Sequence, residues 1–98
     1  MSASDKEEIT RELVLLNKYG MHVRPARLFA KVASRYRADV TVVKDNNVVS
    51  GKSIMALMTL EAVCGSKLKV IASGPDAELV LDELQALVER KFDIPDEQ

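Results

Sequence analysis

The chain contains one histidine, and the residues around it resemble the surroundings of a phosphate site. His22 lies two residues before Arg24 and three before Pro25, and proline suits the first turn of a helix because no hydrogen bond is lost there. A helix start offers unpaired backbone N–H groups and a positive dipole end, and Arg24 can add charge-assisted hydrogen bonds to an anion. Both influences disfavour the imidazolium form, so we expect a neutral, nucleophilic ring at His22. A capping or plain surface histidine is the alternative that this spacing leaves open.

Other kinds of site lack the residues that they need. Gly51-Lys52-Ser53 looks like the end of a phosphate-binding loop, but position 46, where that motif requires a glycine, is Asn46. A catalytic triad is excluded because no acylating nucleophile lies beside the single histidine. The lone Cys64 excludes a disulfide framework and a cysteine-rich zinc site, and we expect no metal and no cofactor. We expect Cys64 to be a buried small apolar side chain rather than a redox switch.

Length and composition favour one globular domain. The chain has 98 residues, of which 47% are hydrophobic and 30% charged, with 14 Lys and Arg against 15 Asp and Glu. This balance excludes a generally basic nucleic-acid-binding protein. We expect flexible tails at 1–8 and 93–98 around a domain at 9–92. Because the sequence has no signal-peptide core and no apolar stretch long enough to span a bilayer, we predict a cytoplasmic protein, and we expect a monomer.

The apolar residues change period several times along this domain. Alternation predicts strands at 9–16, 40–43, 48–49 and 67–72, with a hairpin turn at 45–47 whose residues favour positive φ. Helical spacing predicts a helix from Pro25, a short helix at 54–60 and a final helix that begins after 74–76. The order is β-α-β-β-α-β-α. It predicts an α+β open-faced sandwich, in which three helices cover one face of a four-stranded, mostly antiparallel sheet.

Two motifs at a fixed separation carry a family resemblance. Residues 17–26 read NKYGMHVRPA and residues 51–60 read GKSIMALMTL. Together they resemble the HPr phosphocarrier family of the phosphoenolpyruvate-dependent phosphotransferase system, from about residue 9 to residue 92. The resemblance implies that His22 accepts a phosphoryl group on Nδ1 from phosphorylated enzyme I and passes it to enzyme IIA domains, with Arg24 as the partner of the phosphate. It implies a participant in phosphotransfer that does not turn over alone.

The second motif places Ser53 on the family's regulatory serine, which HPr kinase/phosphorylase phosphorylates. A serine that begins a helix can equally be a simple N-cap. Met21, Val23 and Glu61 depart from the usual family residues, so the sugar carrier and its nitrogen-related paralogue NPr both stay open. A regulatory binding module that acts on a transcription regulator or an enzyme through Ser53 is another alternative, and a small-ligand-binding domain is a third. The regulatory paralogue Crh lacks the histidine, so His22 argues against it.

A docking surface for partner proteins is expected beside these motifs. The short helix at 54–60 cannot bury all of its apolar residues, so Leu57 and Leu60 are expected in the core and its methionines at the surface, where flexible thioethers suit several partners. Basic residues on the solvent face of the first helix form a rim that steers acidic partners. The expected contact residues are Met21, Val23, Arg27, Lys31, Lys52, Ile54, Met55 and Met58.

Overall fold

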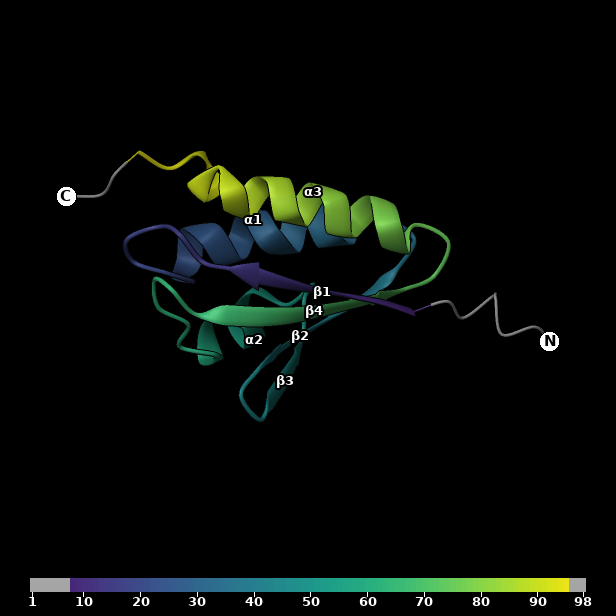
Figure 1. Cartoon of the computed structure of the whole chain (residues 1–98), viewed down its shortest axis with the longest axis horizontal. Helices are drawn as coiled ribbons and strands as arrows, with labels where there is room; N and C mark the ends of the chain where they lie inside the picture. Colours follow the sequence, from purple (N-terminus) through teal and green to yellow (C-terminus); the bar gives the residue numbers. More distant parts are fainter. Residues whose placement is uncertain (1–7, 96–98) are drawn as a thin grey trace.

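Within residues 8–95, which the computed structural model describes, four strands form one sheet and three α-helices cover one of its faces (Figure 1). This confirms the predicted open-faced sandwich and its order of elements. No helix in the described range is long and apolar enough to cross a membrane. The elements in chain order are β1 (Glu8–Val14), α1 (Val23–Ser34), β2 (Asp39–Lys44), β3 (Asn47–Ser50), α2 (Ile54–Thr59), β4 (Lys67–Ser73), α3 (Ala77–Glu89) and the 3-10 helix η2 (Lys91–Asp93).

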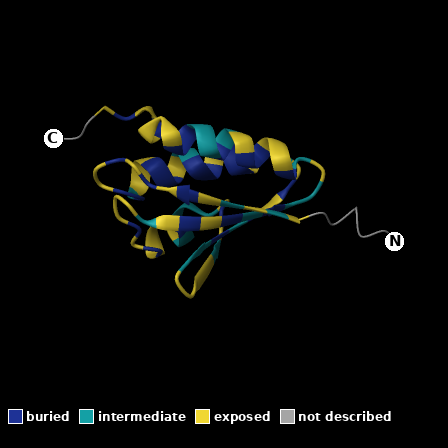
Figure 2. Ribbon diagram, in the orientation of Figure 1, coloured by how far each residue is buried: buried dark blue, intermediate teal, exposed yellow. Residues whose placement is uncertain are grey.

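The sheet has the strand order β1-β4-β2-β3, and every neighbouring pair is antiparallel. Side chains alternate between the two faces of a strand, so each register pair lies wholly on one face. Leu13 faces Leu68, and Val42 faces Val70, on the side that the helices cover. The opposite face carries exposed charged and polar residues on the same strands. The alternation read from the sequence therefore sets which face is buried (Figure 2).

The core lies between the sheet and the apolar stripes of the helices. Phe29 of α1, Leu57 of α2 and Leu84 of α3 are fully buried, and Leu60 beside α2 is 2% exposed. Both leucines of the short helix thus point inward, as the sequence predicts. Burying each such side chain stabilises the fold by about 1.5–3 kcal/mol. The core therefore fixes α2 by one side only and leaves its other side at the surface.

Polar contacts join the last helix to the elements beneath it. Arg11 of β1 donates to Asp82 of α3 at 2.7 Å, and the Tyr36 hydroxyl donates to Glu83 of α3. The hydrogen bond to Glu83, more than burial, raises the pKa of Tyr36 above its ordinary value of 10.0. These contacts join the middle of α3 to β1 and to the segment that follows the end of α1.

The β2–β3 connection is a tight hairpin. Lys44 pairs with Asn47, which leaves Asp45 and Asn46 as the turn residues, and Asp45 has φ 56°. Aspartate and asparagine tolerate this left-handed region better than most residues. The positive φ expected from the composition of 45–47 is therefore found at Asp45.

Several boundaries differ from those expected. Helix α1 begins at Val23, two residues before Pro25, because proline is tolerated anywhere in the first turn, where backbone N–H groups have no partner within the helix. The expected tails at 1–8 and 93–98 lie mostly outside the described residues. Within the described part, Glu8 pairs with Ser73 as the first residue of β1, and Ile94 is 9% exposed at the other end.

The expected burial of Cys64 is wrong, because its side chain is exposed. Ser66 N–H donates to the Val63 carbonyl at 2.9 Å, which makes Cys64 and Gly65 the central residues of a turn. Central turn residues project toward solvent, and the buried position of this loop is taken by Ala62 instead. The Cys64 thiol lies 3.7 Å from the Leu16 carbonyl oxygen.

Candidate functional site

The connection between β1 and α1 is a tight turn that packs against the loop at 61–66. Gly20 N–H donates to the Asn17 carbonyl at 3.2 Å, and the Asn17 side-chain amide donates to the Gly20 carbonyl at 2.8 Å. Met21 N–H donates to the Ala62 carbonyl at 2.9 Å. Gly20 has φ +68°, and a Cβ atom there would lie 2.2 Å from the Ala62 oxygen. Only glycine fits this position, so the turn and the loop touch through their backbones.

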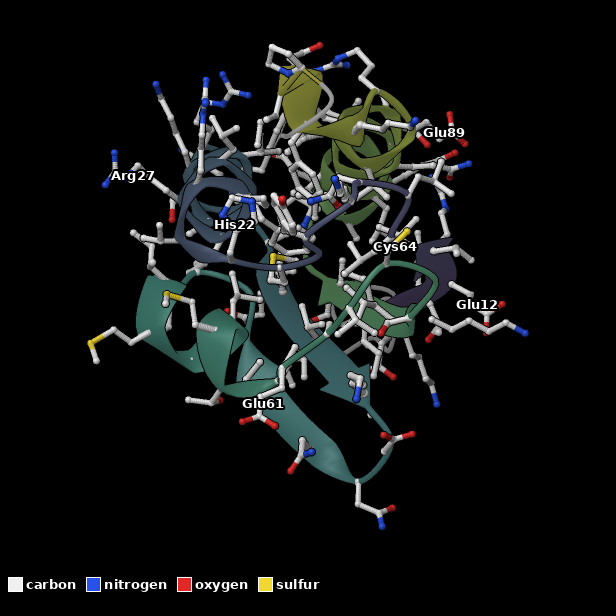
Figure 3. All side chains as sticks on the ribbon, turned by 90° about the vertical axis from the view of Figure 1, so that its left-hand side faces the viewer. Glu12, His22, Arg27, Glu61, Cys64 and Glu89 are labelled. Atoms are coloured by element: carbon white, nitrogen blue, oxygen red, sulfur yellow. The ribbon has the colours of Figure 1, made fainter. Side chains whose placement is uncertain are left out.

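His22 is the N-cap residue of α1, and its backbone rather than its ring performs that role. Its backbone is extended (φ −87°, ψ −169°), and its carbonyl accepts the first helical hydrogen bond, from Ala26 N–H at 2.9 Å. The side chain makes no capping hydrogen bond to the described first turn. Figure 3 looks at the end of the molecule where α1 begins and shows His22 near the middle of that end. The ring is half-buried and is not used for capping, so the capping explanation of this histidine does not hold.

The first turn of α1 provides the anion-binding features that the sequence predicts. Because an α-helix starts with N–H groups that have no carbonyl partner, the amides of Val23 and Arg24 are outside the helical ladder, and Pro25 has no N–H. The described residues of the first turn of α1 include no acidic side chain that would offset the positive end of the helix dipole. The Arg24 side chain is exposed. An anion bound at this helix start would therefore meet the amides of Val23 and Arg24.

One contact at His22 was not expected from the sequence. The Tyr19 ring lies edge-on to the imidazole, with the ring centroids 6.3 Å apart and the planes at 75°. The Lys18 Nζ lies 5.3 Å from the centroid of the Tyr19 ring. An aromatic residue three positions before the only histidine, inside a turn, was the available signal. The turn thus brings an aromatic ring and a cation to the edge of the site.

Ser53 begins α2 and performs the capping role that its position allows. Its Oγ accepts a hydrogen bond from Ala56 N–H at 3.1 Å, while its own N–H donates to the Ser50 carbonyl at 3.3 Å. Helix α2 packs against α1, which carries His22 at its start. A phosphate on Ser53 would sit at a helix N-terminus, where negative charge is favourable.

One residue of the expected docking surface is buried, and the others are exposed or half-buried. Met21 is 4% exposed, so its side chain packs in the core and does not lie on the surface. Its neighbour in the chain, Val23, is exposed instead. Figure 3 shows Arg27 pointing outward from α1. Of the other expected contact residues, Lys31, Lys52, Met55 and Met58 are exposed and Ile54 is half-buried.

Sequence reasoning overlooked further apolar residues around this end of the chain. Leu16, Tyr19 and Val63 are exposed large hydrophobic residues on the turn before His22 and on the loop packed against it. No periodicity predicts the exposure of these side chains, because they lie in the connections of the structure rather than in its helices or strands. Their exposure depends on the contact between the two connections.

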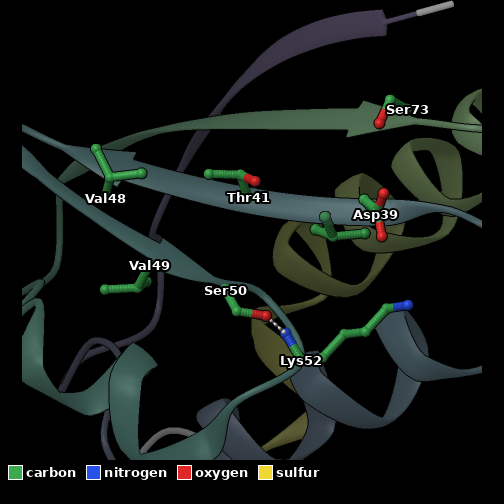
Figure 4. A pocket seen from close by; sticks show the side chains of 8 residues that line it. Asp39, Thr41, Val48, Val49, Ser50, Lys52 and Ser73 are labelled. Atoms are coloured by element: carbon green, nitrogen blue, oxygen red, sulfur yellow. Dashed lines mark hydrogen bonds between the residues drawn. The ribbon is translucent and has the colours of Figure 1, made fainter. Parts of the chain in front are cut away.

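The described residues form no metal site, and the groove on the sheet does not include His22. In the described range, no group of three or more His, Cys, Asp or Glu side chains could hold a metal ion. A groove on the open face of the sheet is lined by polar residues such as Asp39, Thr41, Ser50 and Lys52 (Figure 4). His22 is not part of this groove. His22 lies instead at the end of the molecule where α1 begins (Figure 3).

Comparison with known proteins decides the family. Residues 9–90 match the family model described as the PTS HPr component phosphorylation site. The chain belongs to the HPr phosphocarrier family. This HPr-family chain is 36% identical over 85 residues to the phosphocarrier protein HPr of Treponema pallidum, a match that covers 87% of the chain and 97% of the relative. The crystal structure of HPr-C-His from Thermoanaerobacter tengcongensis matches with a TM-score of 0.80 and 41% identity, over 90% of this chain and 97% of that one.

Relatives with other names are also similar to the chain over most of its length. The phosphocarrier protein NPr of Shewanella violacea is 35% identical over 86 residues, which cover 88% of this HPr-family chain and 94% of the relative. The HPr-like protein Crh of Bacillus subtilis is 40% identical over 74 residues, which cover 76% of this chain and 87% of the relative. Similarity therefore establishes the family, and the choice of branch rests on individual residues such as His22.

Proposed function

We propose that this HPr-family chain relays a phosphoryl group from phosphorylated enzyme I to enzyme IIA proteins through His22. The observation that carries the proposal is the position of His22 at the start of α1, where its backbone caps the helix and its ring does not. The match to the family's phosphorylation-site model includes this residue and Arg24. Because a Crh-type regulator lacks the histidine, His22 favours a carrier over a purely regulatory protein.

The transfer step needs positioning and charge rather than acid–base groups. The Nδ1 lone pair of His22 attacks the phosphorus of the donor phosphohistidine, and the P–N bond to the donor ring breaks with its electron pair returning to that nitrogen. The transferred group carries its charge on equatorial oxygens in a loose transition state. In this proposal the amides of Val23 and Arg24, at the start of α1, and the Arg24 guanidinium bind those oxygens. In the transfer to enzyme IIA the same step is repeated, with phosphorylated His22 as the donor and enzyme IIA as the acceptor.

The surface around His22 suits exchange between several protein partners. Met55, exposed at 78%, and Met58 present flexible apolar contacts on α2. Arg27 and Lys31 add exposed positive charge on α1, which favours acidic partners. We propose that a single chain is the carrier unit. A cytoplasmic location accords with a lone cysteine that stays a free thiol.

Regulatory phosphorylation of Ser53 is the second part of the proposal. Its support is that Ser53 lies at the N-terminus of α2, immediately before two residues of the docking surface, Ile54 and Met55. A phosphate adds a charge of about −1.5 to −2 at neutral pH. On that surface it would have to be desolvated on docking, so it would weaken association with enzyme I. HPr kinase/phosphorylase and a transcription regulator are the partners implied by such a site.

Labelled phosphoenolpyruvate with enzyme I tests the carrier function. We expect label on His22 of the wild-type protein, located by mass spectrometry, and none on a folded His22→Ala variant. Arg24→Ala should slow transfer by about 10- to 100-fold, because it removes one charged donor from the transferring group. Arg37→Ala, which removes another exposed arginine away from the start of α1, is the matched control and should transfer normally. Full labelling of His22→Ala, or a wild type that takes no label from an active enzyme I, would refute the proposal.

A further inference from the structure

Asn17 is the only polar side chain that is buried among residues 8–95, with an exposed fraction of 3%. A buried amide is unfavourable unless its donors and acceptors are paired. The Asn17 Nδ2 donates to the Gly20 carbonyl at 2.8 Å, whereas Oδ1 has no hydrogen-bond partner in the described part of the chain. An apolar residue of similar size would avoid this half-satisfied amide. Its presence therefore points to a role for the one hydrogen bond that it makes.

That hydrogen bond ends on the same atom that holds His22. The Gly20 carbonyl oxygen accepts from Asn17 Nδ2 at 2.8 Å and from His22 N–H at 3.0 Å. The peptide between Gly20 and Met21 is thus held from within the turn by Asn17. It is held from outside by the Ala62 carbonyl, to which Met21 N–H donates at 2.9 Å. The backbone that leads into His22 therefore has its carbonyl and its amide both fixed.

We propose that Asn17 is a positioning residue for the phosphoryl acceptor: its side-chain amide fixes the Gly20 carbonyl and thereby the orientation of His22 at the start of α1. The proposal rests on the carrier function proposed above. The backbone of Gly20 is conformationally permissive because glycine has no Cβ atom. Without the Asn17 amide, the Gly20 carbonyl can therefore rotate and lose its hydrogen bond from His22 N–H. The imidazole and the edge-on Tyr19 ring would then sample directions that do not align with the amides of the first turn.

If Asn17 positions His22, its loss should lower the rate of transfer without weakening the docking of enzyme I. A displacement of about 1 Å at a reacting group can cost on the order of 100-fold in rate. We expect Asn17→Ala to lower the transfer rate at saturating enzyme I by about 10- to 100-fold. The apparent KM for enzyme I should change less than about threefold, because the exposed residues of α1 and α2 are unaltered. A residue that served only stability would leave the turnover of the folded fraction unchanged.

The experiment compares Asn17→Ala and the near-isosteric Asn17→Asp with an exposed asparagine control, Asn46→Ala, in the β2–β3 turn. Transfer kinetics are measured well below each melting temperature. Hydrogen exchange of the His22 amide is followed by NMR on the unphosphorylated protein. We expect slowed turnover and about tenfold faster exchange of this amide in each Asn17 variant that folds, and neither change in Asn46→Ala. Asn17→Asp retains the volume of the side chain but loses the N–H donor, so it addresses the hydrogen bond if Asn17→Ala fails to fold.

Three results would overturn the proposal, and the first two concern variants that fold. One is wild-type turnover in a folded Asn17 variant, and the other is slowed turnover with the protection of the His22 amide unchanged. Failure of both variants to fold would also refute it, because Asn17 would then be needed for the fold itself. If wild-type protein accepts no phosphate, the carrier function fails and the catalytic part of this proposal fails with it. The exchange experiment then still reports whether Asn17 orders His22, which keeps the two failures distinguishable.

Discussion

Replacing Gly20 with alanine tests the contact between the turn before His22 and the loop at 61–66. Gly20 has φ +68°, and its Cβ position lies 2.2 Å from the Ala62 oxygen and 2.8 Å from the Val63 Cα. Both neighbours are backbone atoms that cannot rotate away. Gly65 is a matched control, because it also has a positive φ, of +93°, but nothing lies within 4 Å of its Cβ position. The same substitution at the two sites separates backbone strain from collision.

The magnitudes follow from these two terms. A non-glycine residue in the left-handed region costs about 1–2 kcal/mol, which both variants share. Overpacking against fixed atoms costs a further 1–3 kcal/mol or so, which only Gly20→Ala incurs. We therefore expect Gly65→Ala to lose about 1–2 kcal/mol of unfolding free energy and Gly20→Ala about 2–5 kcal/mol. For a domain of this size, each kcal/mol lowers the melting temperature by about 4–8 °C.

Thermal and urea unfolding of the two variants measure this difference directly. Gly20→Ala should melt at least about 4 °C below Gly65→Ala. Phosphorylation by enzyme I, assayed where both variants are folded, should be slowed in Gly20→Ala, because the turn must move away from the loop and carry His22 with it. Equal stability losses in the two variants would show that the turn and the loop are not in the close contact described above. Wild-type phosphorylation kinetics in Gly20→Ala would show that this contact does not control His22.

Two further predictions concern Ser53 and Tyr36. Ser53→Asp keeps a helix cap and should raise the apparent KM for enzyme I with little change in melting temperature, whereas Ser53→Ala should lose about 1 kcal/mol of stability with the cap and keep normal kinetics. If Ser53→Asp matches wild type and Ser53→Ala is impaired in transfer, Ser53 is only a structural cap. The raised pKa of Tyr36 means that the unfolded chain loses the phenol proton first, so stability falls as the pH rises from about 10 through the raised pKa. Tyr36→Phe should flatten this alkaline decline in urea unfolding, and an equal decline in both proteins would contradict the role of the Glu83 hydrogen bond.

The candidate site at His22 combines rigid and adaptable parts. His22 lies at the end of the molecule where α1 begins rather than in the groove on the open face of the sheet (Figure 3). The rigid parts of the site are backbone: the start of α1 and the turn that the 61–66 loop supports. The adaptable parts are exposed side chains such as Met55, Met58 and Arg27. The proposed carrier function requires such a division, because the geometry at His22 has to stay constant while different partners dock around it.

The sequence by itself determined the order of the elements and the positions of His22 and Ser53 at helix starts. Period-two and helical patterns predicted the order of strands and helices, because side-chain direction along a strand or helix follows directly from chain geometry. The same local logic placed His22 at a helix start and Ser53 at another, since capping and dipole effects depend on residues only a few positions apart. Leu57 and Leu60 were likewise assigned to the core from the length and period of one short helix.

Only the tertiary structure decided what the connections do. Cys64 is exposed and Met21 is buried, against expectation, because the turn before His22 and the 61–66 loop pack on each other. The hydrogen bond from Met21 to Ala62 and the closeness of Gly20 to the same residue join segments that are distant in the chain. No local pattern encodes such a contact, because loop residues have no period and their burial depends on whatever other segment the fold brings beside them. The same holds for the buried amide of Asn17. The sequence shows that the residue is an asparagine, but its hydrogen bond to the Gly20 carbonyl, which accepts from His22 N–H, forms only in the folded chain.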